Sequence, residues 1–118
     1  TASPEIALNA LDICCSPSLF GEGFSNSIAE AMACGCRVVT SAVAPMTDVA
    51  GKAATYSDPD NVESAAAMIE SVLREPEAQR QVHVNAGLVR AAQLSGRAMA
   101  TAYLTVYRDV LQRHARVA

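Results

Sequence analysis

The chain has 118 residues and a formal net charge of −3 at pH 7, with 51% hydrophobic and 18% charged side chains. This length allows about one domain with a modest core, and the composition excludes an intrinsically disordered chain. The acidic balance argues against a nucleic-acid-binding surface, which needs a stripe of basic side chains. Residues 1–10 lack the basic leader of a signal peptide, and no apolar run approaches the roughly 18–20 residues that cross a bilayer.

The first half of the chain predicts strands and one short helix. Residues 10–16 are an apolar run that Pro17 stops, which is typical of a strand buried on both faces of a parallel sheet. Residues 18–24 are rich in glycine and small side chains and indicate a loop. A helix is expected over residues 27–34, with Gly35 as its C-terminal stop. Residues 36–41 predict a second buried strand, and residues 53–57 a weaker third.

The second half predicts helices. A turn at residues 58–61 is expected to cap the next helix, with Asp60 and Glu63 at the spacing of a capping box. The apolar face of that helix is predicted to be Val62, Ala65, Ala66, Ile69, Val72 and Leu73. Further helices are expected over residues 77–93 and 96–114, and the last has an apolar stripe of Met99, Tyr103, Val106, Tyr107 and Val110. This order predicts an α/β domain with a three-stranded parallel sheet and flanking helices.

The four cysteines form two close pairs, Cys14 with Cys15 and Cys34 with Cys36. Neither pair has the usual spacing of zinc ligands, and neighbours on a strand point to opposite faces of the sheet. The spacing therefore favours small buried apolar residues in a reducing cytoplasm, and no metal site is expected. The two histidines, His83 and His114, are expected on the surface rather than as acids or ligands.

The loop after the first strand carries the chemistry, because ligands of parallel sheets bind beyond the carboxyl ends of the strands. Glu22 lies between two glycines that let the backbone approach a ligand closely. Ser25, Asn26 and Ser27 then open a helix whose first amides have no intrahelical partner and suit a phosphate. Glu30 lies about one turn into that helix. The segment offers, in order, a carboxylate for sugar hydroxyls, amides for a diphosphate and a second carboxylate for a ribose.

The residues alone leave an alternative for each glutamate. Ser27 and Glu30 also have capping-box spacing, so Glu30 has two interpretations of equal weight, ribose ligand or helix cap. Glu22 on an open loop has the alternative of a solvated charge, which is the more frequent fate of a single glutamate.

This segment resembles the donor motif of retaining glycosyltransferases with the GT-B fold, the family 4 type that includes glycogen-synthase-like enzymes and mannosyltransferases. That motif has two glutamates separated by seven residues. The matching residues are Asp12, Ile13, Pro17, Ser18, Glu22, Gly23, Phe24, Glu30, Ala31, Met32, Ala33, Gly35, Val38 and Val39. The similarity continues through residues 47–51, the turn at 58–60 and the closing helix at 103–111, so it spans nearly the whole chain.

The resemblance implies roles for these residues. Glu22 would bond hydroxyls of the donor sugar and is the catalytic candidate, and Glu30 would bond the ribose. The implied donor-binding set is Glu22, Gly23, Phe24, Ser25, Asn26, Ser27, Ile28 and Glu30. No covalent nucleophile, metal or cofactor is implied, because amides and basic residues neutralise the diphosphate while the protein stabilises charge on both fragments.

The sequence also departs from the family pattern. Arg37 stands where the family usually has proline, Ala44 and Pro45 replace a glycine pair near the donor, and Asp48 replaces glutamate. The upstream basic residues of the family, and its acceptor-binding N-terminal domain, would precede the region represented by this chain. Residues 1–118 are therefore expected to be part of a C-terminal nucleotide-sugar-binding domain, the Rossmann-like half of a GT-B fold.

The leading hypothesis is the donor-binding portion of a retaining hexosyltransferase that uses a nucleoside-diphosphate sugar, in the cytoplasm or at the inner face of the membrane. Its acceptor, a sugar or a lipid, would bind through the missing domain, and the fragment is not expected to be active alone. The alternatives are an epimerase of the same fold and a non-catalytic remnant that binds a nucleotide or a partner. A phosphorylase would need a lysine for pyridoxal phosphate, and Lys52, the sole lysine, lies in no suitable context. Missing strands would leave an apolar edge and predict a homodimer of the fragment.

Overall fold

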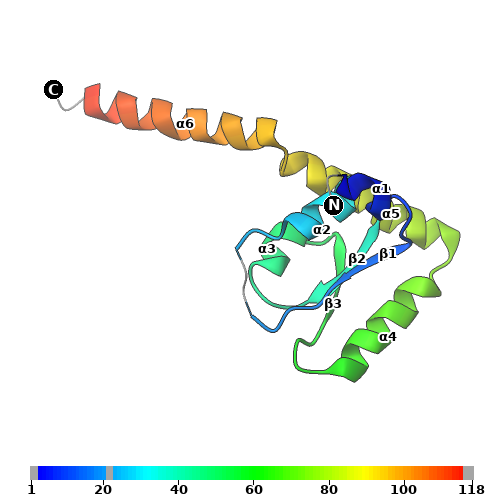
Figure 1. Ribbon diagram of the computed structural model, residues 1–118. Helices are drawn as coiled ribbons and strands as arrows, with labels where there is room; N and C mark the ends of the chain where they lie inside the picture. Colours follow the sequence, from blue (N-terminus) through cyan, green and yellow to red (C-terminus); the bar gives the residue numbers. More distant parts are fainter. Residues whose placement is uncertain (1–2, 21–22, 116–118) are drawn as a thin grey trace.

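The structure is a computed structural model that describes residues 3–20 and 23–115. Figure 1 shows a small sheet between helices, with a long last helix that extends away from the rest. In chain order the elements are α1 (Pro4–Leu8), β1 (Ile13–Ser16), α2 (Asn26–Ala33), β2 (Arg37–Ser41), α3 (Met46–Ala50), β3 (Ala54–Ser57), α4 (Val62–Leu73), α5 (Glu77–Gln93) and α6 (Gly96–Ala115). The predicted α/β class is confirmed.

The sheet has three strands in the order β1-β2-β3, and both pairs are parallel. The central strand β2 is buried along its whole length, as the sequence predicts. The expectation that the first strand is buried on both faces is wrong. β1 lies at the edge of the described sheet, its residues are only partly buried, and Cys15 is exposed.

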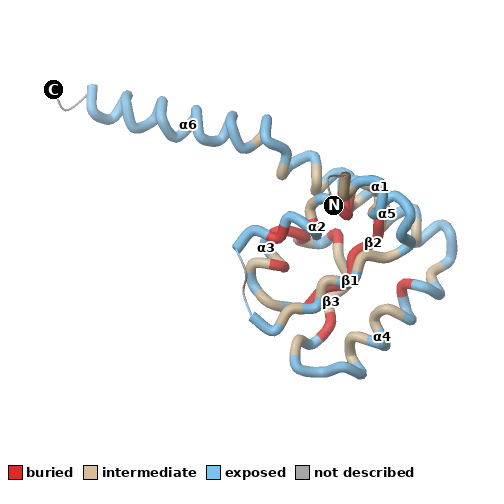
Figure 2. Tube along the Cα trace, viewed as in Figure 1, coloured by how far each residue is buried: buried red, intermediate tan, exposed pale blue. Residues whose placement is uncertain are grey.

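Helices cover both faces of the sheet because successive residues of the central strand point to opposite sides. Val38 belongs to the main core with Ile28 and Met32 of α2 and with residues of α3. On the other face α4 packs across all three strands, and its Val72 is 1% exposed. Figure 2 shows that buried residues concentrate in β2 and in the helix turns facing it.

Two short helices, α1 and α3, were not expected from the sequence. The predicted capping box of Asp60 and Glu63 is also wrong. The N-cap of α4 is Asn61, whose side-chain oxygen accepts the Ser64 amide at 2.9 Å. The glycine stop after α2 is confirmed, because Gly35 has a φ of 72°, in the left-handed region that favours glycine.

The predicted apolar face of α4 is only partly confirmed, since Val72 is buried whereas Val62 is 79% and Leu73 59% exposed. The stripe of α6 is exposed throughout, from Met99 to Val110, and Figure 1 shows this helix leaving the body of the protein. Dimerisation through this helix stays a prediction.

The cysteines are free thiols with different surroundings. Cys36 is buried, and burial above all raises its pKa to about 11. Burial also raises the pKa of Cys14 and of Cys15 above the ordinary value. The expectation of buried apolar cysteines holds for Cys36, is partly met by Cys14 and Cys34, and is wrong for Cys15.

Candidate functional site

Hydroxyl groups at the carboxyl edge of the sheet fix the start of the loop after β1. Ser41, the last residue of β2, accepts the backbone amide of Ser18 on its Oγ at 2.9 Å. Thr40 Oγ1 donates to the Ser16 carbonyl at 2.8 Å, and the Ser18 hydroxyl donates to the Phe20 carbonyl at 2.8 Å. These bonds fix the backbone of residues 16–20 at the end of β1.

The first turn of α2 has the open amides that an anion site requires. Ser25 is the N-cap residue and is 4% exposed, and no side chain caps the helix among the residues that the structure describes. The hydroxyls of Ser25 and Ser27 lie 3.3 Å apart, beside each other rather than on the helix amides. Because Asn26, Ser27 and Ile28 are the first helical residues, their amides have no intrahelical acceptor.

Glu30 is exposed on α2 and does not serve as a cap. The capping alternative required Ser27 at the N-cap. The helix instead begins at Asn26, and Ser25 occupies the N-cap position without a side-chain hydrogen bond. Glu30 instead lines a hollow of about 250 Å³ together with Pro4, Glu5 and Leu8 of α1. The carboxylate is thus available to a ligand in the space between α1 and α2.

The remaining residues of the implied set lie in the loop or contribute only their backbone. Glu22 falls outside the described residues. Gly23 and Phe24 are exposed, whereas Ile28 as a whole residue is 0% exposed and belongs to the core. Phe24 and Asn26 also line a hollow of about 640 Å³ against the junction of α5 and α6.

Two parts of this arrangement were missed by the sequence analysis. The first is α1, although proline at its first position after a serine is a recognised signal of a helix start. The second is the bond between Ser41 and Ser18, for which the sequence carries no signal, since the two residues are 23 positions apart.

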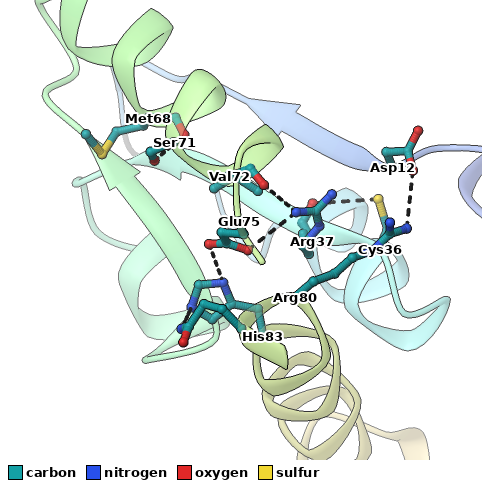
Figure 3. Close-up of polar contacts among 10 residues, drawn as sticks. Asp12, Cys36, Arg37, Met68, Ser71, Val72, Glu75, Arg80 and His83 are labelled. Atoms are coloured by element: carbon teal, nitrogen blue, oxygen red, sulfur yellow. Dashed lines mark hydrogen bonds and ion pairs between the residues drawn. The ribbon is translucent and has the colours of Figure 1, made fainter. Parts of the chain in front are cut away.

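Arg37, the main departure from the family pattern, has a structural role away from this edge. Its guanidinium donates to the Val72 carbonyl and pairs with Glu75 at 3.4 Å, and Glu75 also contacts His83 Nδ1 at 2.8 Å (Figure 3). Arg37 begins β2, and Val72 is the buried residue in the otherwise exposed last turn of α4. The cluster joins the start of the central strand to α4 and α5.

The sequence resemblance is supported by three independent comparisons. Residues 3–75, more than half of the chain, match the family model described as glycosyl transferases group 1. The chain belongs to this family. It is 35% identical over 89 residues to O-antigen chain mannosyltransferase B from Escherichia coli, a match that covers 75% of this chain and 23% of that protein.

A solved structure shows the same fold. Sucrose-phosphate synthase from Thermosynechococcus elongatus matches with a TM-score of 0.73 and 27% identity over 92% of this chain. The fold is therefore that of a truncated Rossmann-like half of a GT-B glycosyltransferase. The chain spans about a quarter of the length of these relatives, 23% of one and 27% of the other.

Neither a metal-binding cluster nor a membrane-spanning helix is present in the described ranges, residues 3–20 and 23–115. No group of three or more histidine, cysteine, aspartate or glutamate side chains is arranged there to hold a metal ion. None of the helices in these ranges is both long and apolar enough to cross a membrane.

Proposed function

We propose that this chain is the donor-binding portion of a retaining glycosyltransferase that moves a hexose from a nucleoside-diphosphate sugar to an acceptor. One observation carries the proposal. The family motif falls at the carboxyl edge of a parallel sheet, where the first amides of α2 have no intrahelical acceptor and no side chain of the described residues caps them. Membership of the glycosyltransferase family supports glycosyl transfer in general, and this geometry supports a diphosphate at the helix end.

In the proposed reaction, the acceptor hydroxyl oxygen forms a bond to the anomeric carbon while the bond from that carbon to the diphosphate breaks. The hydroxyl proton passes to the departing diphosphate, and attack from the vacated face retains the anomeric configuration. The amides of the exposed residues Asn26 and Ser27 stabilise the developing phosphate charge without reorganisation. Glu22 binds the donor sugar, and Glu30 binds the ribose in the hollow beside α1.

Glu30 provides a test that is independent of turnover. In the natural polypeptide that carries this chain, binding of UDP, GDP and ADP is measured by titration calorimetry. Loss of a charged hydrogen bond costs about 1.5–3 kcal/mol, so Glu30→Ala should weaken the tightest of the three nucleotides roughly 10- to 100-fold. Its melting temperature should match that of Glu63→Ala, a control at an exposed position of α4. Unchanged affinity of Glu30→Ala for every nucleotide would remove Glu30 from the donor site.

Glu22 tests the proposed catalytic role. Glu22→Ala should remove a charged hydrogen bond made in the transition state while folding stays intact. The loss of transition-state stabilisation is about 2–4 kcal/mol, which lowers turnover roughly 30- to 1,000-fold. The sugar nucleotide incubated without acceptor separates the alternatives. An epimerase would change the sugar of the donor, a non-catalytic remnant would bind it without turnover, and a transferase would leave it intact until an acceptor is supplied.

A further inference from the structure

The hydroxyl groups at the carboxyl edge of the sheet make different hydrogen bonds although they are similarly buried. Thr40 and Ser41 at the end of β2 are each 1% exposed, and Ser57 at the end of β3 is 3% exposed. The Ser57 hydroxyl donates to the Thr40 carbonyl at 3.5 Å, which keeps its bond inside the sheet. The Ser41 oxygen instead accepts an amide from the loop that leads to the family motif.

The Ser18 amide depends on this contact. Pro17 has no N–H group, and at Ser18 the chain has already left the ladder between β1 and β2, whose last pair is Ser16 with Thr40. Ser41 Oγ, at 2.9 Å, is therefore the acceptor that replaces the lost ladder partner. An amide in this part-buried position is unfavourable without an acceptor, so the bond fixes where the backbone at Ser18 lies.

We propose that Ser41 is a positioning residue of the donor site, which acts by holding the Ser18 amide and with it the backbone of residues 17–20. Ser41 itself touches no donor atom. Its hydroxyl sets where the backbone of residues 17–20 lies, and Gly23, Phe24 and the first turn of α2 follow these residues in the sequence. The inference rests on the proposed function for its consequence in donor binding, whereas the loop anchoring itself is independent of that function.

The natural polypeptide is tested with three variants. Ser41→Ala removes the acceptor, and Ser41→Cys keeps nearly the same volume but offers sulfur, a weak acceptor. Ser57→Ala is the matched control. Ser57 is the cross-strand partner of Ser41 and is similarly buried, and its hydroxyl donates to the Thr40 carbonyl within the sheet.

The first measurement is hydrogen exchange of the peptide that covers residues 17–20, followed by mass spectrometry without ligand. Ser41→Ala should speed exchange of the Ser18 amide at least 10-fold, Ser41→Cys should be intermediate, and Ser57→Ala should match the wild type. A merely structural effect would raise exchange across the strands in both serine-to-alanine variants. Equal protection of residues 17–20 in all variants would overturn the proposal, and Ser41→Cys supplies this comparison even where Ser41→Ala does not fold.

The second measurement is donor binding and transfer. Affinity for the tightest of UDP, GDP and ADP should fall about 5- to 10-fold in Ser41→Ala and change less than twofold in Ser57→Ala, with kcat/KM for transfer following affinity. Faster exchange with unchanged affinity would overturn the functional part of the proposal. Failure of the proposed function gives a different pattern, because Glu30→Ala would then leave nucleotide affinity unchanged while the exchange result at Ser18 stands.

Discussion

Replacing Arg37 by methionine should destabilise the fold. The Arg37 side chain is 5% exposed and that of Glu75 is 12% exposed, so both charges are largely removed from water. At 3.4 Å and an effective dielectric constant of about 20, their attraction is about 5 kcal/mol. Desolvation of both groups opposes this attraction, and the buried Arg37 Nε has no partner within the described ranges, which lowers the net value further.

Removing one member of such a pair typically costs about 3–5 kcal/mol, because the other charge is left buried. Here the cost should be smaller, about 2–3 kcal/mol, since Glu75 keeps His83 as a partner at 2.8 Å. The Val72 carbonyl also keeps a weak bond from the Glu75 amide at 3.4 Å. For a cooperative unit of this size, such a loss corresponds to a fall in melting temperature of roughly 8–12 °C.

The assay is a thermal melt combined with a double-mutant cycle of Arg37→Met, Glu75→Met and the two together. The double variant replaces the pair with apolar side chains and should recover at least half of the loss in either single variant. Arg74→Ala is the control, because its ion pair with Glu70 is exposed and contributes little. A neutral or stabilising Arg37→Met would refute the reasoning, as would additive effects in the double variant.

Two further predictions concern the helix cap and the buried thiol. Asn61→Ala should lower the free energy of unfolding by about 1 kcal/mol in a denaturant titration, whereas Asp60→Ala should have no measurable effect, because Asn61 makes the capping bond. An equal loss in Asp60→Ala would contradict the assignment. The pKa of Cys36 in the folded state is about 11, above its ordinary value of 9.0, so its contribution to stability is complete below pH 9 and is lost as the pH rises to 11. The wild type should therefore lose about 2 kcal/mol more than Cys36→Ala between pH 8 and pH 11, and identical pH profiles would exclude this origin.

The sequence by itself determined the class of fold and the place of the candidate site. The apolar runs at β1 and β2, the helix that ends before Gly35 and the glycine-flanked Glu22 are local patterns, each set by residues within about 20 positions of one another. Hydrophobic periodicity and turn chemistry act over that range, which is why the three strands, the bounds of α5 and the family motif could all be predicted. The capping error at Asp60 shows the limit of the same rules, since two neighbouring residues were both suitable caps and backbone geometry selected Asn61.

Tertiary structure alone decided the roles of the residues whose partners are distant in the chain. Arg37 appeared only as a departure from a pattern, and its contacts with Val72 and Glu75 become possible when α4 crosses the sheet. Ser41 carried no signal at all, because its amide partner comes from another strand's loop. In both cases the deciding contact joins segments that only packing brings together, and no local propensity encodes which buried polar group will meet which acceptor.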